Sequence, residues 1–295
     1  MRILQKGPVT FKPLKPLEVL LNRINHKLAQ RHIKLFPQVV IFSFDHVGLT
    51  INLQGRYEND ELILLENFIK HKLSNSKESA ALDIGANIGN HSIFLSNYFY
   101  KTFAFEPNPI TFDVLTINSK YAVENKNIYL FNFGLSDKKN SLPFQIDSTN
   151  MGGSRIITNK NKSKNFNKQI TIELKKADDL EFLRKEKISL IKIDVEGHEL
   201  SVLKGAENII KDNAPVILFE QDVNDICDGG SKVLSYLSSL GYIFYTIEKR
   251  FYFGESFIAR ILELFLSSIF GSQLVFKNTK IFLKRSYNMI LAMPK

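Results

Sequence analysis

The segment Leu82-Asp83-Ile84-Gly85-Ala86-Asn87-Ile88-Gly89-Asn90 decides the fold. It closes an apolar run of strand length and opens a helical pattern, and a glycine-rich turn in that position lets the backbone approach a nucleotide-like ligand. The glycines follow G-x-x-x-G spacing, and Asn87 stands where a dinucleotide site needs a glycine beside the pyrophosphate. The turn therefore favours a ligand without a pyrophosphate.

Glu106 stands 21 residues after Gly85, at the end of the next apolar run. A carboxylate in this place accepts hydrogen bonds from ribose hydroxyls, so adenosine recognition is supported independently of phosphate. The alternative is purely structural, with Gly85 and Gly89 permitting a tight turn and Glu106 capping the helix after Pro107. The combination at this spacing favours the binding interpretation.

Short apolar runs alternate with helical patterns from Ser79 onward. This alternation predicts an α/β fold with a mostly parallel sheet covered by helices on both faces. The predicted strands are 80–84, 102–105, 128–133, 188–193, 216–219, 242–247 and 287–292, and the predicted helices are 60–73, 90–98, 110–123, 178–185 and 199–213.

Three segments depart from the alternation. Residues 142–171 read as an inserted exposed hairpin with a solvated Asn/Lys-rich loop at 159–168, and residues 39–53 read as a β-hairpin turning at Asp45-His46-Val47-Gly48. A further helical segment is expected within 249–280, where Arg260 and Glu263 on the 256–270 helix argue against a transmembrane span. We therefore predict an N-terminal basic extension over 1–56 and one catalytic domain over 57–295.

The chain has 295 residues, 44% of them hydrophobic and 23% charged, which is typical of a globular protein. Its single cysteine, Cys227, excludes a disulfide scaffold, and the lack of a signal-peptide pattern predicts a cytoplasmic protein. The net charge of +9 is concentrated in residues 1–36 and 249–295. Basic ends fit a peripheral membrane contact, an anionic substrate or another subunit, and the 256–270 helix fits a homodimer interface.

A second group of polar residues closes the strand 188–193. Asp194, Glu196, His198 and Glu199 gather where open α/β sheets bind ligands. The alternative interpretation is that Glu196 and Glu199 are favoured by a helix dipole and that His198 is a surface histidine. Asp194 with Glu220 or Asp222 offers oxygen ligands for Mg²⁺, but no spacing is diagnostic of a metal and none is predicted.

These blocks resemble those of the FkbM-type methyltransferases. The resemblance rests on Asp83 to Gly89, on Phe105-Glu106-Pro107-Asn108, and on Ile191 to Glu199 continuing through Val202 to Ala206. It implies a Rossmann-like seven-stranded methyltransferase fold that binds S-adenosyl-L-methionine. The cofactor-binding residues that it implies are Asp83, Gly85, Ala86, Asn87 and Gly89 in the loop, Glu106 with Pro107 at the ribose, and Leu135 and Ser136 near the adenine.

The expected function is O-methylation of a hydroxyl on a glycan, a glycan precursor or another small hydroxyl-bearing acceptor, with the glycan class implied by the resemblance. A hydroxyl needs a base as the bond forms, and Asp194, Glu196 or His198 could supply it. The alternatives are an NAD-dependent nucleotide-sugar enzyme and a non-enzymatic membrane-associated protein. A nucleic-acid methyltransferase is disfavoured because no N-P-P-[YF]-like run follows the strand.

Overall fold

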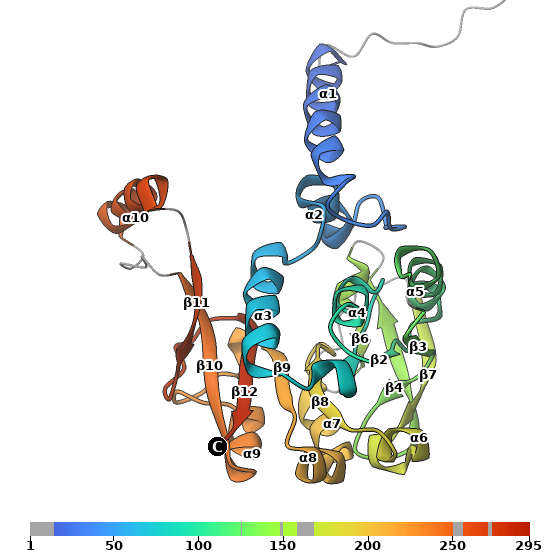
Figure 1. The fold of residues 1–295 in the computed structure, drawn as a ribbon. Coiled ribbons are helices and arrows are strands. Elements are labelled where there is room, and N and C mark those ends of the chain that lie inside the picture. Colours follow the sequence, from blue (N-terminus) through green and yellow to red (C-terminus); the bar gives the residue numbers. More distant parts are fainter. Residues whose placement is uncertain (1–14, 125, 148–149, 158–167, 250–255, 271–272) are drawn as a thin grey trace, which may run out of the picture.

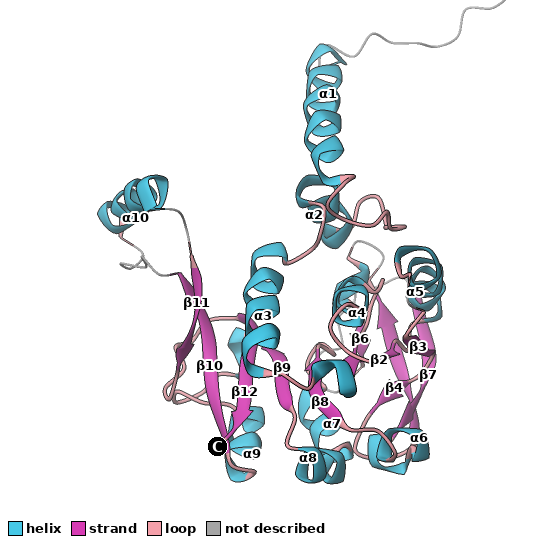
Figure 2. Cartoon of the chain, in the orientation of Figure 1, coloured by secondary structure: helices cyan, strands magenta, loops and turns pink. Residues whose placement is uncertain are grey.

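The computed structural model has a twisted main sheet with helices on both faces and a smaller second sheet at one end (Figure 1; Figure 2). It describes residues 15–124, 126–147, 150–157, 168–249, 256–270 and 273–295. The predicted loop at 159–168 therefore lies, except for Lys168, outside the described residues.

The main sheet has eight strands in the spatial order β11-β10-β12-β9-β8-β1-β2-β3. The five strands from β9 to β3 are parallel, and β12 is antiparallel to both β9 and β10. The predicted α/β fold is confirmed, with β11 added beside β10. The strands are β1 (Ala80–Ile84), β2 (Lys101–Phe105), β3 (Ile128–Phe131), β8 (Ile188–Ile193), β9 (Val216–Gln221), β10 (Tyr242–Lys249), β11 (Leu274–Asn278) and β12 (Tyr287–Pro294).

Each face of this sheet has its own hydrophobic core, because side chains alternate between the faces along a strand. Leu190 belongs to the core under α3 and α4, and its neighbour Ile191 belongs to the core under α7, α8 and α9. A further cluster packs α5 on the sheet through Leu115. The helices are α3 (Asn59–Lys72), α4 (Asn90–Ser96), α5 (Pro109–Ala122), α6 (Glu181–Arg184), α7 (Glu199–Gly205), α8 (Glu207–Asn213) and α9 (Lys232–Ser239), with 3-10 turns η1 (Ser76–Glu78), η3 (Ala177–Asp179) and η4 (Val223–Asp225).

The helix predicted over 199–213 is divided at Ala206 into α7 and α8. The Asp178 carboxylate accepts hydrogen bonds from the Asn208 and Ile209 N–H groups, both at 3.1 Å. These bonds satisfy first-turn donors that a continuous helix would have bonded internally. The break therefore depends on a contact with Asp178, about 30 positions earlier in the chain. The local spacing of apolar residues does not predict such a contact.

The predicted insertion forms the second sheet, in the order β4-β7-β5-β6. Strands β5 and β7 pair antiparallel as a hairpin does, but the expectation that this segment is exposed was wrong. Phe144, Ile146, Ile156, Ile172 and Leu174 form a buried cluster. The elements are β4 (Gly134–Leu135), β5 (Asn140–Ile146), the turn η2 (Met151–Gly153), β6 (Arg155–Ile156) and β7 (Lys168–Lys175).

The β-hairpin predicted over 39–53 was wrong, because α2 (His46–Gln54) occupies its second half. Asp45 caps this helix by accepting a hydrogen bond from the Val47 N–H at 3.0 Å. Gly55 ends it in the left-handed conformation, at φ +83°. The caps override the apolar alternation of residues 49–53, and α1 (Lys15–His32) precedes α2 where no element was predicted.

The helical segment predicted over 249–280 is shorter in the structure. Helix α10 (Phe257–Phe270) is present, whereas residues 274–278 form the edge strand β11 by pairing with β10. Pairing with a neighbouring strand supplies backbone partners that the segment's own sequence does not reveal. Among the described residues, none of the helices combines the length and apolarity that crossing a bilayer requires.

Gly85 is a position at which the fold leaves no room for a side chain. Its φ is +80°, and a Cβ there would lie 1.7 Å from the Asp194 carbonyl oxygen. Gly197 has a similar φ of +93°, but a Cβ there would meet nothing within 4 Å. A side chain at Gly85 would therefore meet both backbone strain and a steric clash, whereas one at Gly197 would meet backbone strain alone.

We expect Gly85→Ala to lower the free energy of unfolding by more than ~3 kcal/mol, because strain and a backbone clash add. Gly197→Ala should cost only the strain, ~1–2 kcal/mol. Urea unfolding of both variants checks this. Equal losses at the two positions would show that the close contact is unimportant.

Candidate active site

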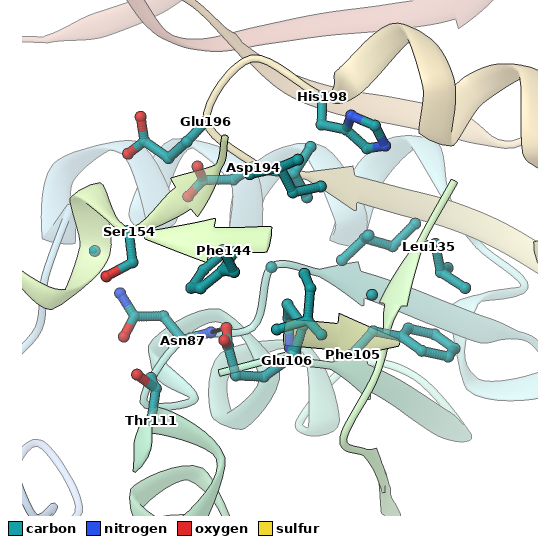
Figure 3. Close-up of a pocket in the computed structure, with 18 of the residues that line it drawn as sticks. Asn87, Phe105, Glu106, Thr111, Leu135, Phe144, Ser154, Asp194, Glu196 and His198 are labelled. Atoms are coloured by element: carbon teal, nitrogen blue, oxygen red, sulfur yellow. Dashed lines mark hydrogen bonds between the residues drawn. The ribbon is translucent and has the colours of Figure 1, made fainter. Parts of the chain in front are cut away.

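The candidate site is a pocket between the carboxyl ends of β1, β2 and β8 and the apolar face of the second sheet (Figure 3). The non-atom space between its walls, open solvent included, is about 640 Å³. The wall contributed by the main sheet and its loops contains Gly85, Asn87, Glu106, Pro107, Thr111, Asp194, Val195, Glu196 and His198.

The turn after β1 forms the floor of the pocket. Asn87 lies in the left-handed region at φ 50°, and Gly89 begins α4 at φ +95°. The Asn118 side chain donates a hydrogen bond to the Ile88 carbonyl at 2.8 Å and holds the turn against α5. The backbone is therefore preorganised in the conformation that an approaching ligand requires.

Glu106 is buried where β2 ends, beside this turn. Its carboxylate accepts hydrogen bonds from the Asn87 N–H at 3.0 Å and from the Asn108 N–H at 2.8 Å. Burial raises the pKa of the Glu106 carboxyl to about 7, although these two N–H groups act in the opposite direction. Each carboxylate oxygen has two acceptor sites, so the side chain can still accept bonds from a ligand hydroxyl.

Two side chains of the pocket carry buried polar atoms without a hydrogen-bond partner. These atoms are Asn87 Oδ1 and Thr111 Oγ1, and Figure 3 shows both side chains near Glu106. A buried polar group without a partner costs free energy, so it marks a place where a ligand supplies the missing bond. Their position fits a ligand with several hydroxyl or amine groups.

The opposite end of the pocket is apolar. It is formed by Phe105, Leu135, Phe144, Ile172 and Leu174, which come from β2 and from the second sheet. A flat heterocycle is accommodated by such a surface, because apolar and aromatic side chains contact its faces. The pocket thus changes from polar near Asn87 to apolar near Leu135.

A buried cation organises the acidic side of the site. Lys192 Nζ lies 3.3 Å from Asp83 Oδ1 and 3.3 Å from Asp194 Oδ2, and it donates a hydrogen bond to the Gly85 carbonyl at 3.0 Å. Asp83 also accepts a bond from the Ser92 hydroxyl. One ammonium group therefore links the turn after β1 to the acidic end of β8.

Glu196 lies at the mouth of the pocket, at φ 52°. The residue is exposed, yet the pKa of its carboxyl is raised to about 7, by desolvation first and then by repulsion from Asp194 and Glu199. Burial and then the charges of Asp194 and Glu196 raise the pKa of Glu220 as well. On this wall the Glu196 carboxyl can therefore exchange a proton near neutral pH.

His198 lies on the same wall with its ring directed away from Glu196 (Figure 3). Its Nε2 is 2.9 Å from the Ser136 Oγ, and burial lowers the pKa of the imidazole, opposed by Asp137. Ser136 in turn donates a hydrogen bond to Asp137 at 3.1 Å. The ring is thus oriented by the residues after β4.

The N-terminal extension contributes to the site through Asp45. This buried carboxylate accepts one bond from the Val47 N–H and another from the Met151 N–H, at 3.1 Å. Met151 and Gly152 line the pocket, and a Cβ on Gly152 would lie 3.2 Å from the Asn87 side-chain nitrogen. The turn η2 is therefore held over the floor of the pocket by a residue about 100 positions earlier.

The structure brings most of the residues predicted from the sequence to the pocket wall. Eight line it: Gly85, Asn87, Glu106, Pro107, Leu135, Asp194, Glu196 and His198. Four lie behind it: Asp83, which pairs with Lys192, Ala86 and Gly89, which shape the turn, and Ser136, which contacts His198. Their roles toward a ligand stay predictions.

Sequence reasoning missed the side chains that β5 and β7 of the second sheet add to the apolar wall, and the polar groups of Thr111 and Asp45. A signal for that wall was available, because Ile170, Ile172 and Leu174 alternate with polar residues as one face of a strand does. Nothing in the sequence indicated the contact between Asp45 and Met151. Within the described part of the chain, no group of three His, Cys, Asp or Glu side chains is arranged to hold a metal ion.

Comparison with known proteins identifies the family. The model of the methyltransferase FkbM domain matches residues 83–244, more than half of the chain and all of the main-sheet wall of the pocket. The chain belongs to the FkbM methyltransferase family. This membership favours the expected methyltransferase over both the NAD-dependent and the non-enzymatic alternatives.

Two curated relatives and one solved structure illustrate the likeness. The hexuronic acid methyltransferase AglP of Haloferax volcanii is 34% identical over 50% of this chain and 58% of its own length. The methyltransferase sdnD of Sordaria araneosa is 29% identical over 43% of this chain and 60% of its own length. The crystal structure of methyltransferase FkbM from Methylobacillus flagellatus KT is 17% identical, with a TM-score of 0.41 over 94% of this chain and 60% of that chain. The chain thus spans less than two thirds of these relatives.

Replacing Asp45 with Ala should release the turn η2, because the Met151 and Val47 N–H groups both lose a buried acceptor. We expect the protection of these two amides against hydrogen exchange to fall roughly tenfold or more. Asp222→Ala is the matched control, because Asp222 caps only its own turn through the Asn224 N–H. Unchanged protection at Met151 in Asp45→Ala would contradict the link.

Proposed function

We propose that this methyltransferase transfers a methyl group from S-adenosyl-L-methionine to a hydroxyl of a glycan or glycan precursor. The observation that carries the proposal is that two groups of polar residues line one pocket. Glu106 lies beside the preorganised turn after β1, and Asp194, Glu196 and His198 follow β8. That the relative AglP is a hexuronic acid methyltransferase supports a sugar acceptor.

The residues present fit the proposed cofactor. Glu106 would accept bonds from ribose hydroxyls, and Asn87 Oδ1 and Thr111 Oγ1 are buried atoms that lack a partner. The apolar surface around Phe105, Leu135 and Leu174 would contact the adenine. Pro107 would lie beside the ribose, and Gly85 would allow the backbone to approach. When bound, this cofactor supplies an activated methyl group on a sulfonium.

The chain's own task is then to orient the acceptor, exclude water and remove the hydroxyl proton. Of the three candidate bases, Asp194 is paired with Lys192, and the His198 Nε2 is engaged by Ser136. Glu196 has a pKa near 7 and lies at the mouth of the pocket, so it would accept the proton most readily at neutral pH. We therefore propose Glu196 as the general base, with Asp194 and His198 positioning the acceptor.

Acceptor recognition would involve η2 and the residue that follows Ser154. Met151, Gly152 and Ser154 line the pocket, and Arg155 exerts an attractive charge on Glu196. The Asp45 contact implies that residues before 57 take part in shaping the acceptor side. The catalytic domain proposed over 57–295 would thus depend on part of the extension over 1–56.

Glu106→Gln should weaken binding of S-adenosylhomocysteine by roughly ten- to a hundredfold, because charge-assisted bonds to the ribose are lost. Ribose hydroxyls donate to the ionised carboxylate, so the wild-type affinity should rise with pH through about 7. The variant should not show this rise. Isothermal titration calorimetry between pH 6 and 8.5 measures the loss of affinity and its dependence on pH. These two pH limits lie about one unit or more on either side of the Glu106 pKa.

The control for this titration is Glu207→Gln, a half-buried carboxylate that pairs with Lys211 and accepts a hydrogen bond from the Tyr236 hydroxyl, away from the pocket. It should bind as the wild type does, and thermal melting should show that both variants are folded. Wild-type affinity in folded Glu106→Gln would remove Glu106 from the proposed site.

Glu196→Gln should lower kcat by roughly 10²–10⁴, because an amide does not accept the hydroxyl proton. The wild-type rate should rise with pH through about 7, since the base acts only when ionised, and the variant should lose this rise. Turnover with a labelled methyl donor and a panel of glycan acceptors checks the prediction. Glu181→Gln is the matched control, because the Glu181 side chain is 72% exposed, and a normal pH profile in Glu196→Gln would refute the base assignment.

A further inference from the structure

Helix α1 carries an apolar stripe that nothing in the described chain covers. No residue of this 18-residue helix is buried. Leu17, Leu20, Leu21 and Ile24 are exposed, and with Leu28 they recur at the spacing of three and four residues that places side chains on one helix face. An isolated soluble helix would not be expected to keep such a stripe in water.

Basic side chains border this stripe. Arg23, Lys27 and Arg31 follow one another at intervals of four residues and therefore line one flank. Within residues 15–36, five Lys or Arg residues stand against the single Glu18. An apolar stripe with a basic flank is typical of helices that lie in the surface plane of a membrane.

Helix α10 also carries apolar side chains that the described part of the chain leaves exposed. Five of its apolar side chains are more than half exposed: Phe257, Ile258, Leu264, Phe265 and Ile269. Among the side chains of α10 that the structure describes, Ala259 is buried. Figure 1 shows α1 and α10 projecting from the same end of the body and separate from each other. Neither helix therefore covers the other.

The positive charge of the chain distinguishes between two candidate partners for the apolar faces of α1 and α10, a second copy of the chain and a lipid bilayer. A second copy would bring the same basic segments, 1–36 and 249–295, which carry most of the positive charge, toward each other. An anionic bilayer would instead be attracted to them, with each basic side chain near the surface adding to the attraction. Charge complementarity thus favours lipid over a dimer.

The extension is attached to the body at defined points. The His32 Nε2 lies 2.9 Å from the Leu53 carbonyl oxygen, which joins the end of α1 to α2. The Asn118 amide exchanges hydrogen bonds with the Val40 backbone, at 2.6 and 3.0 Å. Asp45 then connects the start of α2 to Met151 in the pocket wall. A surface that binds α1 would accordingly lie on the side of the molecule where η2 shapes the pocket.

We propose that α1 and α10 dock the protein on an anionic lipid bilayer, with their apolar faces in the headgroup region and the basic residues of α1 against lipid phosphates. Docking of this kind brings the methyltransferase to acceptors presented at a membrane surface. The contact is independent of the proposed reaction, so its test does not require an active enzyme.

The test is co-sedimentation of the full chain with vesicles of phosphatidylcholine alone and of phosphatidylcholine mixed with phosphatidylglycerol. Binding to the mixed vesicles should be at least about tenfold tighter and should weaken as salt is raised. The double substitution Leu20→Glu with Ile24→Glu should reduce binding about tenfold or more, because two apolar anchors become charged. Leu264→Glu should reduce it through α10.

Val19→Glu is the matched control, since Val19 is 44% exposed beside Leu20 at 54% but lies outside the stripe. It adds one acidic charge to the same helix and should bind close to wild type. Circular dichroism and binding of S-adenosylhomocysteine show that each variant is folded.

Three results would overturn the proposal. The first is equal binding to both kinds of vesicle, and the second is undiminished binding by the folded double variant. The third is a dimer in sedimentation velocity without lipid that the same double substitution dissociates, which would make a second copy the occupant of the stripe.

Discussion

The site depends on the contact between the backbone of Gly85 and the carbonyl of Asp194. At this point β1 and β8 come too close for any side chain, and the Gly85 N–H donates to the Phe105 carbonyl at 2.9 Å. The ends of three parallel strands therefore meet within one turn. Because of this contact, Glu106 and the acidic residues after β8 face each other across one pocket rather than two.

Electrostatics reinforce that geometry. Lys192 is buried between Asp83 and Asp194, and it also bonds the Gly85 carbonyl, so its ammonium group is compensated on several sides. The carboxyl groups that lack so close a cation, Glu106 and Glu196, have pKa values raised to about 7. The site thus separates carboxylates with a structural role from those that can exchange a proton at neutral pH.

Much of this arrangement could be predicted from local sequence. The strands β1 and β8 agree with the predicted runs 80–84 and 188–193 to the residue, because both are short, apolar and followed at once by Gly85 or Asp194. The family motifs then indicated both groups of polar residues in the main-sheet wall, the one around Glu106 and the one around Asp194. Lys192 carried a usable signal too, since a lone lysine inside a buried apolar strand requires acidic partners.

What escaped prediction depends on contacts between distant residues. Residues 49–53 alternate like a strand, but the cap at Asp45, stabilised by Met151, makes them helical. The apolar wall of the second sheet becomes part of the pocket only when that sheet closes on β2, and β11 exists only beside β10. The spacing of apolar residues along the sequence does not reveal these contacts between distant segments.

The central claim is that this single pocket holds the adenosyl cofactor between Glu106 and the wall of Asp194 and Glu196. A crystal structure of the chain with S-adenosylhomocysteine tests it most directly. We expect the ribose hydroxyls within hydrogen-bond distance of the Glu106 carboxylate, the adenine against Leu135 and the sulfur on the side of Asp194. A ligand bound elsewhere, with Glu106 contacting only Asn87 and Asn108, would contradict the account.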